Sequence, residues 1–276
     1  MILTSGVNMR IGRPGQVLGR GRRVPSFDPD ALAYITAVET ADGEALEAGV
    51  KAAINDFVTG CKADGIWDAI KASCILAGAR TLNGCLVPLN GSAPTNINFV
   101  SDDYSRITGL KGDGSTKYLD TNRAHHDDPK DNNHFSVFLT AGDASTSACI
   151  GTRIVDNQHS GFVHSSGDRF FFPSTTNSGA RIIFSGGASA IGFAGCSRTS
   201  GTSATARSDG ANQTSNSTTA LDHLATNFAV FAREGDTPSV LSASRLSFYS
   251  IGEAVDLAAL DARVSALMTA IDGAIT

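Results

Sequence analysis

The sequence is poor in charged side chains, which make up 18% of its 276 residues against roughly 25% in an ordinary soluble protein. It is also poor in aromatic residues, at 7%, and it contains a single tryptophan. Hydrophobic residues still reach 41%, which is enough for a sizeable core. The 29 glycines, together with abundant serine, threonine, alanine and asparagine, favour short strands joined by tight turns over a helical protein.

The five cysteines include no Cys-x-x-Cys pair, and an odd number of them cannot close completely into disulfides. We therefore expect buried, reduced thiols in a protein that folds in a cytosol. The first residues lack the apolar run of a signal peptide, and no stretch approaches ~18 apolar residues. We expect neither secretion through a signal peptide nor a membrane partner. A role outside the cell would then require release by cell lysis, as part of a particle.

The motifs of several enzyme classes are missing. Glycosidases with a sandwich fold use paired carboxylates, most often two glutamates close together on one strand. The only glutamates after residue 85 are Glu234 and Glu253, and neither belongs to such a pair. The sequence contains no G-x-S-x-G elbow and no glycine-rich phosphate loop of a known type. We therefore expect no enzymatic activity and no catalytic residues.

Charge is unevenly distributed along the chain, whose net charge is −5. Residues 1–28 hold five of the 22 basic and one of the 27 acidic side chains, so the remainder has 17 against 26, a net charge of −9. Such an acidic body is not typical of a nucleic-acid-binding domain, and no nucleic-acid partner is expected.

Residues 1–39 are predicted to form a basic, extended arm, because glycines and prolines interrupt any periodic pattern there. We expect this arm to order when it docks on an acidic neighbouring protein, although a solvated tail without a partner is the alternative. The candidate anchoring residues are Arg10, Arg13, Arg20, Arg22 and Arg23.

Residues 40–85 are predicted to form an antiparallel pair of helices. Apolar residues at three- and four-residue spacing predict the first helix over residues 40–62. After a short turn, a similar pattern predicts the second helix over residues 66–77. Trp67 lies on its apolar face and is interpreted as a packing anchor rather than a platform for a ligand.

The pattern changes after residue 85, where short runs with period-two alternation are separated by turn clusters. The run from His134 to Leu139 alternates, and Asp209-Gly210 is typical of a tight hairpin turn. Short strands with turns about every 8–12 residues predict an antiparallel jelly-roll β-sandwich over residues 86–255. The expected fold class is therefore mainly β.

The last segment, residues 256–276, is predicted to be a helix. Its apolar residues are spaced three, four, three and four apart, as in the seam of a coiled coil. Because the run is shorter than the three to four repeats of a typical coiled coil, two interpretations stay open. The helix forms an oligomer seam, or it packs on its own sandwich. The seam residues would be Leu257, Leu260, Val264, Leu267 and Ile271.

The densest polar cluster is the run from His125 to His134. Its aspartates offer the oxygen ligands that Ca²⁺ prefers, but the EF-hand pattern is absent and two adjacent aspartates seldom bind one ion. The histidine spacing is not a known zinc signature. A sugar-binding loop, a Ca²⁺ site and a solvated loop between strands stay open, and no other cofactor is expected. The candidate ligand residues are His125, His126, Asp127, Asp128 and Asp131.

Three segments resemble an early strand, a central hairpin and a final strand of one type of domain: residues 112–119 (GDGSTKYL), 204–211 (ATARSDGA) and 245–252 (RLSFYSIG). In this order they resemble a concanavalin-A-like, laminin-G-type jelly roll, and the likeness covers residues 97–260. The resemblance implies a lectin-like sandwich, and domains of this type often hold a Ca²⁺ ion.

The stretches KADGIW (residues 62–67) and KASCILAGAR (residues 71–80) are similar to virion structural proteins of tailed bacteriophages, including those of cyanobacteria. The resemblance implies a tail fibre or baseplate appendage that recognises a host-surface glycan, works as a homotrimer and binds other virion proteins through its arm. It implies location in the virion, with assembly in the host cytoplasm and release by lysis. The alternatives are a capsid decoration or head-fibre protein that coats the head and, less favoured, a secreted glycan-active enzyme.

Overall fold

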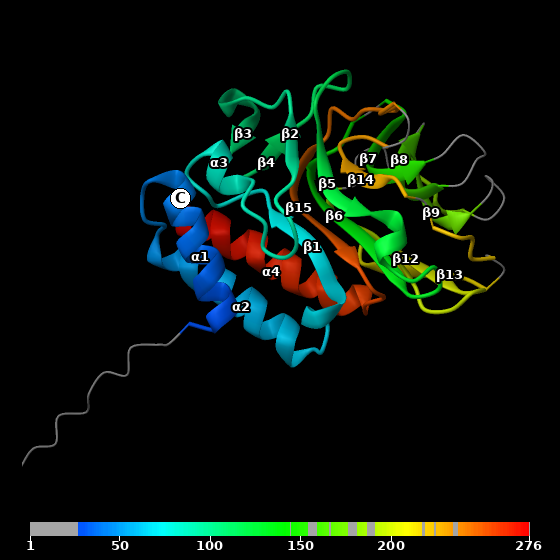
Figure 1. Ribbon diagram of the computed structural model, residues 1–276, viewed down its shortest axis with the longest axis horizontal. Coiled ribbons are helices and arrows are strands. Elements are labelled where there is room, and N and C mark those ends of the chain that lie inside the picture. Colours follow the sequence, from blue (N-terminus) through cyan, green and yellow to red (C-terminus); the bar gives the residue numbers. More distant parts are fainter. Residues whose placement is uncertain are drawn as a thin grey trace, which may run out of the picture.

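The computed structural model describes residues 27–275, except 144, 154–158, 166, 176–180, 187–190, 217–218, 224 and 234–236. The described chain forms two facing antiparallel sheets, with helices packed against one of them (Figure 1). The prediction of a mainly β, antiparallel jelly-roll sandwich with a C-terminal helix is confirmed. No helix within these ranges is both long enough and apolar enough to cross a membrane.

The first sheet is built around two central strands, β6 (Asn133–Ala141) and β15 (Arg245–Gly252). β1 (Ile70–Ile75) also pairs with β15, beyond the stretch that β4 occupies. In spatial order the remaining strands are β13 (Ala211–Ser215), β12 (Ala204–Ser208) and β11 (Gly192–Arg198) on the β6 side, and β4 (Gly109–Lys111) and β3 (Tyr104–Ser105) on the β15 side.

The second sheet packs its inner face on the first. Phe135 of β6 and Phe228 of β14 meet across the interface, with ring centroids 6.3 Å apart. In spatial order the strands of the second sheet are β10 (Ile182–Phe184), β9 (Asp168–Thr175), β8 (His159–Ser165), β7 (Ser147–Arg153), β14 (Asn227–Val230), β5 (Tyr118–Ala124) and β2 (Thr95–Ile97).

Three longer helices cover the outer face and one end of the first sheet (Figure 1). α4 (Leu257–Ile275) lies along α2 (Ala48–Ala63) and against β11 and β12, while α1 (Pro29–Asp42) packs on α2. The short helical elements are α3 (Leu82–Cys85), η1 (Trp67–Ala69), η2 (Ser101–Asp103) and η3 (His125–Asp127).

Helix α1 shows that the predicted extended arm does not continue to residue 39. Asp28 caps the helix, since its Oδ1 accepts a hydrogen bond from the Asp30 N–H at 3.0 Å. Pro29 occupies the first turn, where a missing N–H costs nothing. The apolar face that buries this helix is Ala31, Tyr34, Ile35 and Val38. The helical pair is therefore α1 and α2.

The prediction of a second helix over residues 66–77 was wrong, because this segment forms η1 and then β1. In β1, Ser73 lies opposite Ser250 and Cys74 lies opposite Tyr249 of β15. Five of the six β1 residues are buried, on both faces of the strand. A strand covered on both faces lacks the alternation of apolar and polar residues, so its sequence can be mistaken for that of a buried helix.

The residues predicted to form an oligomer seam are buried inside a single chain. Each is at most 3% exposed, and α4 packs on α2, β11 and β12 of its own chain. The helix therefore packs on its own sandwich, and a seam between copies would require α4 to leave it. These residues are Leu257, Leu260, Val264, Leu267 and Ile271.

Replacing Leu260 with alanine is expected to lower the free energy of unfolding by about 2–5 kcal/mol, because its fully buried side chain would leave a cavity under α4. The matched control is Thr269→Ala on the exposed side of the same helix, which should change the free energy by no more than ~0.5 kcal/mol. Urea unfolding of both variants measures the difference. Equal, small losses would contradict the burial of α4 within one chain.

Candidate functional site

The structure separates the five residues of the predicted ligand loop. His125 and Asp128 point into the protein, at 3% and 4% exposure. The other three, His126, Asp127 and Asp131, are exposed. The five side chains therefore do not face a common ligand.

The contacts of the two aspartates do not fit a Ca²⁺ site. Asp128 accepts two hydrogen bonds from the Arg123 guanidinium, at 2.9 and 2.6 Å. Asp127 accepts one from the Ala124 N–H at 3.0 Å, which holds the turn of η3. In the part of the chain that the structure describes, no three His, Cys, Asp or Glu side chains are grouped so that they could hold a metal ion. The expectation of Ca²⁺ in this loop therefore finds no support in the geometry.

The inward side of the loop instead forms a polar cluster between the sheets. The rings of His125 and His223 stack with centroids 3.7 Å apart, and Ser174 Oγ lies 3.0 Å from Nε2 of each. His223 Nδ1 lies 2.8 Å from the carbonyl oxygens of His125 and Asp128, so this nitrogen carries the proton. The remaining bonds then follow: His125 Nε2 donates to Ser174, and Ser174 donates to His223 Nε2.

Both histidines of this cluster are held neutral. Burial lowers the pKa of His125 well below its usual value, and the neighbouring His223 lowers it further. Burial also lowers the pKa of His223. The chain of hydrogen bonds requires a neutral His223, because its Nε2 can accept from Ser174 only without a proton. His125, Ser174 and His223 bond one another, so the cluster is a structural group rather than a ligand site.

A third histidine, His134 of β6, lies on the other face of the first sheet, under the helices. Its Nδ1 donates to the carbonyl oxygen of Glu253, and its Nε2 lies 2.9 Å from Ser250 Oγ. Ser250 in turn contacts Ser136 Oγ at 2.7 Å. Burial lowers the pKa of His134 to about 4. This histidine is a buried structural group and takes no part in a surface site.

The candidate anchoring arginines of the arm lie outside the described residues: Arg10, Arg13, Arg20, Arg22 and Arg23.

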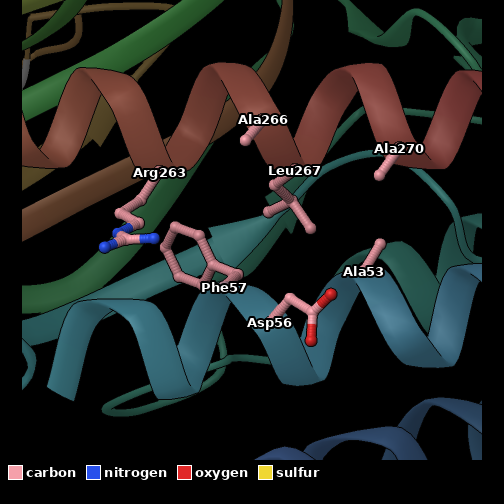
Figure 2. A pocket seen from close by; sticks show the side chains of 7 residues that line it. All are labelled: Ala53, Asp56, Phe57, Arg263, Ala266, Leu267 and Ala270. Carbon is pink, nitrogen blue, oxygen red and sulfur yellow. The ribbon is translucent and has the colours of Figure 1, made fainter. Parts of the chain in front are cut away.

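A pocket of about 160 Å³ lies between α2 and α4. Figure 2 shows Phe57 and Leu267 at its centre and Ala53 and Ala270 facing each other across the gap between the helices. Arg263 stands at one end, and its guanidinium binds Asp64 through two bonds of 2.7 and 2.9 Å. The walls are mostly apolar and this cation is already paired, so the pocket has no set of polar groups for catalysis or sugar binding.

Sequence reasoning missed three arginines on the second sheet. Arg153 ends β7, Arg181 directly precedes β10 and Arg233 lies three residues after β14. Ile150 and Ile182 belong to the core, so alternation along the strands places Arg153 and Arg181 on the outer face. No local pattern connects these positions, because they are distant in the sequence.

The three guanidinium groups share an unusual environment. Each side chain is half-buried, and its Nε atom is shielded from solvent without a hydrogen-bond partner. Most other described arginines form ion pairs, and Arg198 and Arg245 bond to backbone carbonyls. These three pair with no carboxylate of the described residues. Arg153, Arg181 and Arg233 therefore have hydrogen-bonding capacity that the described chain does not use.

The floor beneath these arginines is glycine. Gly151 of β7 pairs with Gly161 of β8, and a Cβ at Gly151 would lie 3.6 Å from Cγ of Arg233. The Arg233 side chain thus lies over Gly151. On the other side, the Arg181 guanidinium stands 4.5 Å from the centroid of the Phe170 ring. Phe170 packs against a small outer cluster made of Ala148, Val163 and Phe172, together with Val240.

The charge of Arg233 is disfavoured by its surroundings. Burial and the like charge of Arg153 lower the pKa of Arg233 to about 10, so it stays charged at pH 7. We name the group of Arg153, Arg181 and Arg233, with the Gly151–Gly161 floor, the arginine face. Guanidinium groups with unused donors can receive a ligand rich in oxygen atoms.

No protein-family model and no curated protein sequence matches the chain. Among solved structures, the botulinum neurotoxin serotype D binding domain is similar with a TM-score of 0.49 and 10% identity, over 72% of this chain and 51% of that one. A mutant of the NanB sialidase from Streptococcus pneumoniae gives a TM-score of 0.41 and 13% identity, over 56% of this chain and 26% of that one.

A mutant of Trypanosoma rangeli sialidase displaying trans-sialidase activity gives a TM-score of 0.42 and 9% identity, over 78% of this chain and 39% of that one. The chain thus spans about half of these structures or less. Because every one of these TM-scores lies below 0.5, the likeness is partial, and the two-sheet fold rests on the strand pairing of this chain itself.

The free energy of unfolding is expected to fall by about 2 kcal/mol between pH 7 and pH 5 through His134 alone. Its pKa is about 4 in the folded chain against 6.5 when unfolded. The unfolded chain therefore binds the proton first, so the stabilisation is complete above the unfolded pKa and is lost as the pH falls towards the folded one. Urea unfolding at the two pH values measures the loss.

The variant His134→Gln should flatten this pH dependence, whereas His126→Gln, at an exposed position of η3, should leave it unchanged. A slope that survives His134→Gln intact would show that other groups carry it.

Proposed function

We propose that this chain is a non-catalytic component of a tailed-phage particle, in a tail fibre or baseplate appendage, and that it binds a glycan on the host surface. The observation that carries the proposal is the unequal cover of the two sheets. The first sheet lies under α2 and α4, whereas no described helix packs on β7 or β8, which carry Arg153 and the Gly151–Gly161 floor of the arginine face (Figure 1).

Anchoring and recognition would then lie on different sides of the molecule. The described chain begins at the helix layer, where the Asp28 N–H donates to Asn55 Oδ1 at 2.8 Å and the Asp28 carboxylate pairs with Lys62 at 2.6 Å. An arm that precedes this point would join the fold beside α2. Other virion proteins would be bound from that side, and the arginine face would point elsewhere.

The assignment to a virion is supported by the segments that resemble phage structural proteins. Residues 62–67 form the end of α2 and the start of η1, and residues 71–80 include β1. The likeness therefore falls in the layer that would do the anchoring. A homotrimer would multiply weak binding of single sugars. Contacts between copies would have to come from surfaces other than the buried face of α4.

The proposal includes no catalytic step. Of the two glutamates in the sandwich region, Glu253 pairs with Lys71 at 2.9 Å, and Glu234 lies outside the described residues. A carboxylate occupied by a lysine is poorly placed to act with a second one on a glycosidic bond.

On purified particles, gold-labelled antibody against residues 97–250 is expected to mark the tail, because host recognition takes place there. Quantitative mass spectrometry should find a few to some tens of copies per particle. Label over the head in hundreds of copies would instead identify a decoration protein. Absence of the chain from every particle would overturn the virion assignment.

Full-length purified chain is expected to compete with particles for host cells and so to reduce their adsorption. Mild periodate treatment of the cells should abolish binding of the chain, because periodate cleaves the vicinal diols of sugars. Protease treatment of the cells is the matched control and should leave binding intact. The opposite pattern would mean that the receptor is a protein.

A further inference from the structure

We propose that the glycan is acidic, and that Arg153 and Arg233 together bind the carboxylate of one of its sugars. This inference rests on the glycan recognition proposed above and names the ligand class and the residues of that same face.

The backbone around Arg233 is shaped to hold this side chain over the sheet. Phe231 and Val240 have φ angles of 69° and 56°, a left-handed conformation that costs free energy for a bulky or β-branched residue. Arg233 and Ser239, which lie between these two points in the sequence, exchange backbone hydrogen bonds of 3.0 and 3.1 Å.

Phe231 and Val240 are both bonded to β7. The Phe231 N–H donates to the Cys149 carbonyl at 2.8 Å, and the Ala148 N–H donates to the Val240 carbonyl at 2.7 Å. The two strained residues thus stand where the chain leaves the sheet and where it returns. These contacts place Arg233 beside β7, where its side chain lies over Gly151. Strain of this kind persists where the surrounding structure enforces it, and it clusters at binding sites.

Arg153 completes a pair of cations on the same face. It lies two residues beyond Gly151 along β7, which is roughly 7 Å in a strand. Arg233 and Arg153 are near enough for the charge of Arg153 to lower the pKa of Arg233. No carboxylate of the described residues pairs with either of them to relieve the repulsion, and both Nε atoms lack a partner. A single anion between the two guanidinium groups would remove the repulsion and accept bonds from both.

A carboxylate suits this pair better than sugar hydroxyls alone. Its two oxygens match the planar fork of arginine in a bidentate arrangement, and its charge compensates the desolvation that both cations suffer. A neutral hydroxyl accepts a hydrogen bond but leaves the two like charges uncompensated. Acidic sugars should therefore bind more tightly than neutral sugars of the same size.

Arg181 extends the face towards a second sugar. β10 is separated from β7 by β8 and β9, so the strands that carry Arg181 and Arg153 are roughly 14 Å apart. A short oligosaccharide can bridge that interval. Phe170 of β9, against whose ring the Arg181 guanidinium stacks, lies between these two strands.

Isothermal titration calorimetry with the full chain tests this ligand class. Two acidic probes, sialyllactose and cellobiouronic acid, are compared with their neutral counterparts lactose and cellobiose. We expect at least one acidic probe to bind about tenfold more tightly than its neutral counterpart. Which of the two binds distinguishes a sialic acid from a uronic acid.

The variants Arg153→Gln and Arg233→Gln should each raise the Kd for the acidic probe about tenfold. Arg233→Lys, which keeps the charge but loses the fork, should weaken binding as well. Lys111→Gln, at an exposed position of β4 in the first sheet, makes the same change in net charge and should have no effect. Urea unfolding of each variant confirms that it is folded.

The outcomes separate this inference from the function on which it rests. Neutral and acidic probes bound equally well, with no effect of either arginine variant, would overturn the inference and leave glycan binding standing. Binding weakened to the same extent by Lys111→Gln would mean general attraction of anions and would also overturn it. No binding to these four probes, together with periodate-insensitive cell binding, would overturn both proposals.

Discussion

The burial of β6 and β15 on both faces is the constraint on which the rest of the structure depends. On one face Phe135 meets Phe228 of the second sheet, and on the other Phe248 meets Phe57 of α2, with ring centroids 5.7 Å apart. Both faces of these strands must therefore be shielded from solvent. The second sheet shields one face and the α2–α4 pair shields the other. The outer face of the second sheet takes no part in covering these two strands.

Local signals were sufficient to predict the sandwich. Asp209 and Gly210 have φ angles of 53° and 72° between β12 and β13, as a tight hairpin turn requires, and the composition of the turn shows this without tertiary information. Residues 66–77 were misread for the opposite reason. β1 is defined by its pairing with β15 at the far end of the sequence, and its burial on both faces removes the alternation that identifies a strand.

The candidate site was less predictable than the fold. The polar content of residues 125–134 was evident from the sequence, but the direction of the side chains was not. His125 turns inward to Ser174 of β9, a residue 49 positions away in the sequence, and no local pattern connects the two. The arginine face depends on three segments brought together by strand order. It also depends on left-handed backbone at Phe231 and Val240, which are residue types that no turn rule would place there.

That these arginines pair with no carboxylate of the described residues is informative because acids are plentiful in the chain, which has 27 acidic against 22 basic side chains. Elsewhere arginines use these acids: Arg123 pairs with Asp128 at 2.6 Å and Arg207 with Asp261 at 2.8 Å. Arg153 and Arg233 have no carboxylate partner among the described residues, although the chain is rich in acidic side chains. The electrostatic cost is then best explained by an anion that comes from outside the chain, since an internal partner would compete with it for the same two forks.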